Sequence, residues 1–93
     1  MKTGKRTNGP ATCVIRYSQL APATQRGKLR ELTALNCTEP GKGHGSKLLQ
    51  AVCAEADAAG VSLLLTADSP ELGRWYHKHG FRAIQDQPLV MLR

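Results

Sequence analysis

The chain has 93 residues, of which 41% are hydrophobic and 22% charged, as is typical of one soluble globular domain. No apolar run approaches the roughly 20 residues of a membrane span, and no apolar stretch of a secretory signal follows the basic residues 1–10. The formal net charge is +6, with nine Lys and Arg against two Glu in residues 1–47. This basic half would suit a nucleic acid, an acidic protein or a phosphorylated cofactor.

Three widely spaced cysteines, Cys13, Cys37 and Cys53, set the expected compartment. An odd number without a C-x-x-C pair argues against a disulfide framework and against structural zinc, so we expect a reducing cytoplasm. His77 and His79 with Cys53 do not form a recognisable metal spacing, and no metal is expected. A chain this short should be marginally stable, which leaves a homodimer open.

The N-terminal part predicts a tail, a strand, a loop and a second strand. Residues 1–10 are expected to be a flexible basic tail, and residues 11–93 a single domain. Residues 12–18 are rich in β-branched and aromatic types and predict a strand, whereas Pro and Gly in residues 19–27 predict a loop. Residues 28–37 alternate with neither face cleanly polar, which predicts a strand inside a sheet. One face of this strand would carry Leu29, Glu31, Thr33 and Leu35.

The central part predicts a glycine-rich turn at 38–45, a helix over about 45–59 and a buried strand at 61–66. Gly60 is a natural stop for this helix. The apolar residues of the helix recur at helical spacing: Leu48, Leu49, Val52, Cys53, Ala56 and Ala59.

The C-terminal part predicts a second helix and two short strands, 81–84 and 89–92. Ser69 can cap the helix, Pro70 suits its first position, and Gly80 ends it. A stripe along the helix contains Leu72, Trp75, Tyr76 and His79.

Alternating glycines at Gly41, Gly43 and Gly45 lie between a predicted strand and a predicted helix. Glycine lets a ligand approach the backbone closely, and the unpaired N–H groups of a helix N-terminus attract anions. The G-x-G-x-G spacing matches neither the nucleoside-triphosphate loop nor the dinucleotide fingerprint. The pyrophosphate of another molecule is therefore the expected ligand, with a plain tight turn as the alternative.

Two segments resemble the signatures of the GNAT superfamily of N-acetyltransferases. GKGHGSKLLQAV is similar to the cofactor motif Q/R-x-x-G-x-G/A, with its glycines at Gly43 and Gly45. SPELGRWYHKHGFR is similar to the later signature, in which an aromatic-Tyr pair precedes Gly-Phe. The chain departs from the pattern at Pro40, where the motif has Gln or Arg, and it lacks a counterpart of the family's N-terminal strand and two helices.

The resemblance implies an α/β (α+β) fold, a GNAT-like mixed sheet with two packed helices in the order β-β-α-β-α-β-β. It also implies acetyl-CoA as cosubstrate. The pantetheine arm would run along Leu35, Asn36 and Cys37. The pyrophosphate would bind backbone N–H groups of the loop, at Lys42, Gly43, His44, Gly45 and Ser46.

Two residues are candidates for the chemistry of acetyl transfer. By the resemblance, Tyr76 protonates the departing thiolate, with core packing as its alternative role. Glu31 is a candidate general base, and an ion pair with Lys28 or Arg30 is the alternative. His44 has a suitable pKa range for a base but a position that usually packs inward, and Cys37 is expected to pack as a small hydrophobe.

Three functions remain open on this basis. The first is an N-acetyltransferase acting on a primary amine, with a protein acceptor expected and no membrane involved. The second is a catalytically inactive GNAT-like binding module. The third, less favoured, is a basic nucleic-acid-binding protein, because aromatic residues are only 4% and offer few stacking platforms.

Overall fold

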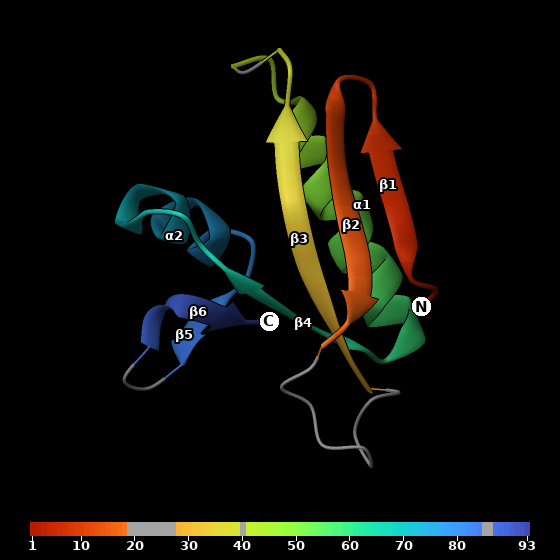
Figure 1. Cartoon of the computed structure of the whole chain (residues 1–93), viewed down its shortest axis with the longest axis vertical. Helices are drawn as coiled ribbons and strands as arrows, with labels where there is room; N and C mark the ends of the chain where they lie inside the picture. The colour runs from red at the N-terminus through yellow and green to blue at the C-terminus, as the bar shows by residue number, and fades with distance from the viewer. Residues whose placement is uncertain (19–27, 40, 85–86) are drawn as a thin grey trace.

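A computed structural model of the protein describes residues 1–18, 28–39, 41–84 and 87–93. The described part forms a six-stranded sheet with two helices (Figure 1). The elements, in chain order, are β1 (Gly4–Asn8), β2 (Ala11–Tyr17), β3 (Leu29–Cys37), α1 (His44–Ala59), β4 (Ser62–Thr66), α2 (Pro70–His77), β5 (Arg82–Ile84) and β6 (Gln87–Leu92).

The sheet is mixed and has the order β1-β2-β3-β4-β6-β5. Its one parallel pair among the described strands is β3 with β4, and α1 provides the crossover between them. α1 packs behind β1, β2 and β3, whereas no described helix lies over the opposite face of these strands (Figure 1). The expected α/β fold class is confirmed.

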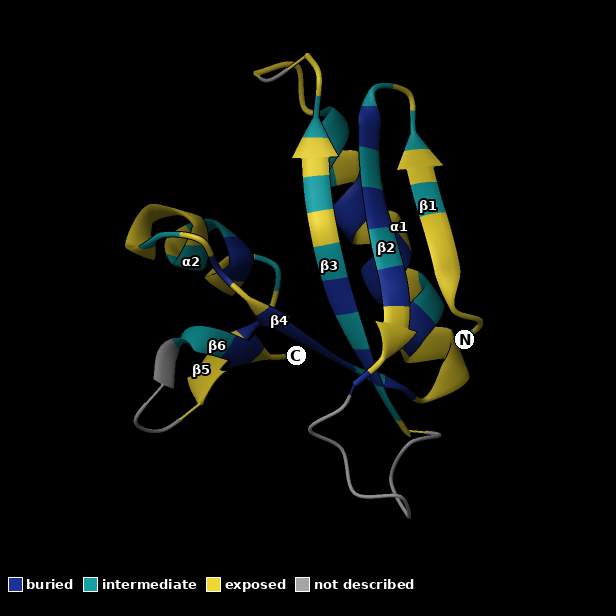
Figure 2. Ribbon diagram, in the orientation of Figure 1, coloured by how far each residue is buried: buried dark blue, intermediate teal, exposed yellow. Residues whose placement is uncertain are grey.

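The core lies between α1 and the sheet. Ala11, Cys13 and Ile15 alternate along β2 with less buried residues and are at most 1% exposed (Figure 2). Their partners on α1 belong to the predicted stripe: Leu48, Leu49, Val52, Cys53 and Ala56 are all buried. Ala59 is exposed, contrary to the prediction, because it is the last helical residue and lies at the end of the stripe.

Residues 1–10 are not the flexible tail that the sequence predicts. Gly4–Asn8 form the edge strand β1, which pairs antiparallel with β2. Arg6 fixes this strand to α1, because its guanidinium donates to both carboxylate oxygens of Glu55 at 3.0 and 2.9 Å. The sequence analysis predicted a tail because residues 1–10 are basic. In the structure, however, the charged Arg6 side chain of this segment is paired with α1.

A bulge in β3 changes which of its residues face the core. Ala34 has φ of 54°, and the pairing with β2 shifts between Thr12 and Val14. The extra residue reverses the alternation. Leu35 therefore packs against the core on the side of Leu32, and not on the face of Glu31 as the alternation predicts.

The strands β3 and β4 pair over a short distance and then separate. Their parallel register runs from Leu29 opposite Ser62 to Glu31 opposite Leu64. Beyond Glu31, the described residues provide no strand partner for the side of β3 that faces β4. The C-terminal half of β3, which is the upper half in Figure 1 and ends at Cys37, therefore has backbone N–H and C=O groups available for a ligand.

The remaining predicted elements agree with the structure to within a few residues, including β3 as an internal strand. Gly60 ends α1 with φ of 69°, and Val61 N–H donates to the Ala56 carbonyl at 2.9 Å, as a glycine C-cap requires. The predicted loop 19–27 lies outside the described residues. No helix of the described part is long and apolar enough to cross a membrane.

Candidate functional site

A pocket of about 520 Å³ lies between the upper half of β3, the glycine loop and α2. Its volume is within the usual range for small-molecule sites. The lining residues are Leu35, Asn36, Cys37, Glu39, Gly41, Gly43, His44, Gly45, Ser46, Asp68, Leu72, Trp75 and Tyr76. The structure thus brings together the predicted strand residues, most of the predicted loop residues and Tyr76.

The glycine loop is shaped by backbone conformations that favour glycine. Gly41 and Gly43 have φ of 85° and 81°, and Gly43 is the N-cap of α1. Its carbonyl accepts the Lys47 N–H at 3.0 Å, which starts the helix. The N–H groups of His44, Gly45 and Ser46 therefore precede the first helical hydrogen bond. All three residues line the pocket, and such N–H groups at a helix N-terminus can bind an anion.

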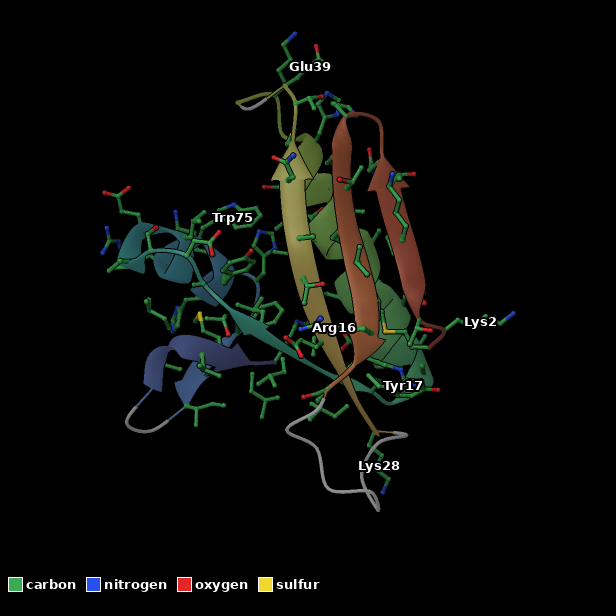
Figure 3. The ribbon with its side chains drawn as sticks, in the orientation of Figure 1. Lys2, Arg16, Tyr17, Lys28, Glu39 and Trp75 are labelled. Atoms are coloured by element: carbon green, nitrogen blue, oxygen red, sulfur yellow. The ribbon has the colours of Figure 1, made fainter. Side chains whose placement is uncertain are left out.

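Gly45 has a packing role in addition to its place in the loop. A side-chain carbon built at Gly45 would lie 3.9 Å from the Trp75 indole. The ring reaches from α2 toward β3 (Figure 3). The indole therefore lies against the first turn of α1, and this contact fixes α2 beside the glycine loop.

Charges at the mouth of the pocket are mixed. The first turn of α1 contains no acidic residue, which leaves the positive end of the helix dipole uncompensated. Lys42, a predicted cofactor residue, does not line the pocket with its side chain; its ammonium pairs with Glu39 at 3.5 Å. Glu39 lies in the turn after β3 (Figure 3) and is the carboxylate nearest in sequence to the glycine loop.

Cys37 has a free thiol, as do Cys13 and Cys53. Its sulfur donates to the Glu39 carbonyl at 3.3 Å. It is partly buried against the core, as expected for a small hydrophobe. No group of three potential metal-ligating side chains occurs among the residues that the structure describes.

Tyr76 is 6% exposed and lines the pocket. Its ring contacts Trp75 and Phe81, with centroid separations of 5.0 and 5.7 Å. Every fully buried side-chain nitrogen or oxygen in the described chain has a hydrogen-bond partner, and no described group bonds the Tyr76 hydroxyl. The hydroxyl oxygen therefore reaches open space, which the pocket provides.

Burial and the nearby negative charge of Asp68 raise the pKa of Tyr76 to about 12. The phenol is therefore fully protonated at neutral pH and can donate a hydrogen bond to a group in the pocket. Tyr76 can therefore pack against Phe81 and also donate a hydrogen bond into the pocket, because its ring is enclosed while its hydroxyl is not.

Glu31 does not line this pocket. Its carboxylate pairs with Arg16 on β2 at 3.1 Å rather than with Lys28 or Arg30. Arg16 lies at the end of the sheet opposite Glu39 and the glycine loop (Figure 3). The role of Glu31 as a base stays a prediction, and it would require the carboxylate to leave Arg16.

Besides Glu39 in the turn, the sequence analysis did not assign three pocket residues beyond the glycine loop to the site: Asp68, Leu72 and Trp75. Leu72 and Trp75 were assigned to a packed stripe, yet Leu72 is 39% exposed because it lies along the pocket wall. Asp68 had a usable signal. It follows β4 at the carboxyl end of a parallel strand, where ligand-binding residues of α/β sheets gather.

Comparisons with known proteins show which known folds this arrangement resembles. No protein-family model matches the sequence, and no curated protein matches it. The crystal structure of the anti-CRISPR protein AcrVA5 matches with a TM-score of 0.76 at 18% identity, over 100% of this chain and 99% of AcrVA5. The protein has a GNAT-like fold.

Two longer proteins contain the same fold. One is a Tyr-to-Phe mutant of the toxin AtaT, bound to the C-terminus of the antitoxin AtaR and to acetyl-CoA, with a TM-score of 0.64 and 16% identity. The other is a predicted phosphinothricin N-acetyltransferase, with a TM-score of 0.62 and 25% identity. Each match covers 89% of this chain, which spans 57% of the first protein and 59% of the second.

Proposed function

We propose that this protein transfers the acetyl group of acetyl-CoA to a primary amine of a protein. The observation that carries the proposal is the convergence of three features on one pocket: the unpaired edge of β3, the N-terminus of α1 and the Tyr76 hydroxyl. Each feature suits a different part of acetyl-CoA. The names of two structural neighbours, one bound to acetyl-CoA and one an N-acetyltransferase, support the same ligand and reaction.

The cofactor is expected to bind through backbone groups. Along Leu35, Asn36 and Cys37, amides of the pantetheine arm can pair with the backbone N–H and C=O groups that point away from β2, where β4 has diverged from β3. The pyrophosphate would accept hydrogen bonds from the first N–H groups of α1. Leu72 and Trp75 provide an apolar wall for the methylene groups between them.

Acetyl transfer requires an amine nitrogen that has lost its proton. The nitrogen attacks the thioester carbonyl, the carbon–sulfur bond breaks, and the sulfur leaves as a thiolate that takes up a proton. The oxygen of the tetrahedral intermediate carries negative charge, and a backbone N–H beside the Ala34 bulge is the candidate donor to it.

Tyr76 is the candidate donor to the departing sulfur, and its pKa limits how it acts. Full transfer of a proton from a phenol of pKa about 12 to an ordinary thiolate of pKa about 8.5 would be uphill by about 5 kcal/mol. We therefore assign Tyr76 a hydrogen bond to the developing thiolate, completed by the proton that the new amide nitrogen releases.

A protein acceptor is supported by access to the site. The face of β1, β2 and β3 opposite α1 has no described helix over it (Figure 1), so a folded partner could approach. The structural neighbour AtaT is bound to the C-terminus of the antitoxin AtaR, which is consistent with a protein partner.

Replacing Tyr76 by Phe tests the proposal. Loss of one hydrogen bond to a charged group is worth about 1.5–3 kcal/mol, so Tyr76→Phe should lower kcat about 10- to 100-fold. Acetyl-CoA should bind the variant as it binds the natural protein. Tyr17→Phe is the matched control, because Tyr17 is 55% exposed and lies away from the pocket.

The readout is acetylation of lysine-bearing proteins by labelled acetyl-CoA, followed by mass spectrometry. Acetyl-CoA binding without any amine product would favour the inactive binding module instead. An equal rate for Tyr76→Phe and Tyr17→Phe would remove the assigned role of Tyr76.

A further inference from the structure

A second, smaller cavity of about 90 Å³ adjoins the pocket where β3 and β4 separate. Leu35, Asp68 and Tyr76 line both cavities, so the two meet at the Tyr76 side chain. The other residues around the small cavity are Leu32, Thr33, Ala34, Leu65 and Thr66. The small cavity contains no residue of the glycine loop and is therefore separate from the predicted pyrophosphate site.

The position of the small cavity suits the group that attacks the thioester. The Ala34 bulge, where the oxyanion donor is expected, forms one of its walls, and Tyr76, the proposed donor to the departing sulfur, forms another. Thr66 is exposed and Thr33 is partly exposed, so the cavity is open to solvent on the β3–β4 side. A slender side chain can enter there while acetyl-CoA occupies the larger pocket.

Asp68 is the acidic residue that lines both cavities. Its side chain is exposed and has no hydrogen-bond or ion-pair partner in the described part of the chain. Asp68 is not needed to cap α2, because the neighbouring Ser69 hydroxyl accepts the Leu72 N–H at 3.2 Å. An acidic side chain without a structural task, at the junction of two cavities, is available to bind a cation.

We infer that the small cavity is the acceptor subsite and that Asp68 binds the ammonium group of a cationic primary amine, such as a lysine side chain. This inference rests on the proposed acetyl transfer and adds the charge of the substrate to it. The protein would select amines that are charged in solution, and it would hold the nitrogen beside the thioester until the proton leaves.

Asp68 is a positioning residue and not the base. A carboxylate is a much weaker base than an alkylamine, so it cannot readily take the proton of an ammonium group. The ammonium group therefore releases its proton to water before the nitrogen attacks. Because Asp68 attracts the charged form before reaction, its removal should weaken amine binding and leave the chemical step intact.

The test compares Asp68→Asn with Glu71→Gln, a matched loss of one negative charge. Glu71 lies on the first turn of α2 and lines neither cavity. The substrates are N-acetyl-lysine amide, which is cationic at neutral pH, and its aminooxy analogue, whose nucleophilic nitrogen is uncharged. With acetyl-CoA saturating, Asp68→Asn should raise KM for the cationic amine about three- to fivefold, as expected for one exposed charge pair.

The same variant should leave kcat unchanged or slightly raised, and it should leave KM for the aminooxy analogue within about twofold. Glu71→Gln should change neither KM. An unchanged KM for the cationic amine in Asp68→Asn, or an equal rise for both substrates, would overturn the role of Asp68. If the natural protein binds acetyl-CoA but acetylates no amine, the proposed function fails first and the inference with it.

Discussion

Replacing Gly43 by Ala tests the loop geometry with little steric disturbance. Gly43 has φ of 81°, and a side-chain carbon built there would meet no atom within 4 Å. The methyl group therefore fits, and its cost is conformational: a non-glycine residue in this left-handed region loses about 1 kcal/mol. If the loop keeps its conformation in the free protein, this cost lowers the free energy of unfolding. If the loop relaxes in the free protein, the cost weakens acetyl-CoA binding instead.

Gly60 provides a matched control at the other end of the same helix. It has φ of 69° and likewise has open space around its would-be side chain. Gly60→Ala should lower the free energy of unfolding by about 1 kcal/mol, which corresponds to about 4–8 °C in Tm for a domain of this size. Because Gly60 lies away from the pocket, acetyl-CoA affinity should not change.

Gly43→Ala should weaken acetyl-CoA binding about fivefold if the strained loop relaxes in the free protein and must be restored on binding. Isothermal titration calorimetry gives Kd, and a thermal melt of the same samples gives Tm. Equal acetyl-CoA affinity in the natural protein and Gly43→Ala, with no loss of Tm in Gly43→Ala, would refute a strained, cofactor-binding conformation of this loop.

Three further predictions concern charged and titratable groups. Because the pKa of Tyr76 is about 12, kcat/KM should rise with pH as the amine loses its proton and show no fall near pH 10, where an ordinary Tyr would ionise; a fall there, absent in Tyr76→Phe, would contradict this assignment. Glu39→Gln should tighten acetyl-CoA binding about two- to fivefold, because it removes a repulsive carboxylate and frees Lys42 for the phosphates; weaker binding by calorimetry would count against a phosphate at this position. The hydrogen bonds from Arg6 lower the pKa of Glu55, so this pair should contribute about 0.5–1 kcal/mol above the ordinary Glu pKa, with the contribution lost as pH falls through the lowered value; urea denaturation at pH 7 and pH 3 should show a larger loss for the natural protein than for Glu55→Gln.

Features set by a few neighbouring residues were predictable from the sequence. Gly43 and Gly60 mark the two ends of α1, and Ser69 with Pro70 starts α2. Each depends on a local rule: a left-handed glycine or a side chain that accepts a backbone N–H. The resemblance placed Tyr76 at the site, and the structure puts its hydroxyl at the pocket.

Features that depend on distant residues were not predictable in this way. β1 exists because Arg6 finds Glu55, which is 49 positions away in the sequence. The bulge at Ala34 carries no local signature, because alanine rarely adopts a positive φ, and a shift of one residue moves Leu35 to the other face. Tertiary pairing with β2 outweighs local preference here.

The candidate base illustrates the same limit at the site. Alternation along residues 28–37 predicted that Glu31 and Leu35 share one face of the strand before the glycine loop, which made Glu31 a candidate base. The bulge separates their faces, and Arg16 on the neighbouring strand pairs with Glu31. The position of Asp68 after β4 could have indicated a site residue, but the two cavities that it lines depend on the separation of β3 from β4, which no local pattern predicts.

Calorimetric titration of the protein with acetyl-CoA tests the central claim most directly, since it requires no knowledge of the acceptor. Saturable binding of one molecule per chain with Kd near micromolar, about −8 kcal/mol, is the predicted result. Free coenzyme A and desulfo-coenzyme A should also bind, because the backbone contacts and the pyrophosphate site do not require the acetyl group. An absence of binding up to millimolar acetyl-CoA, with the protein folded, would contradict the account.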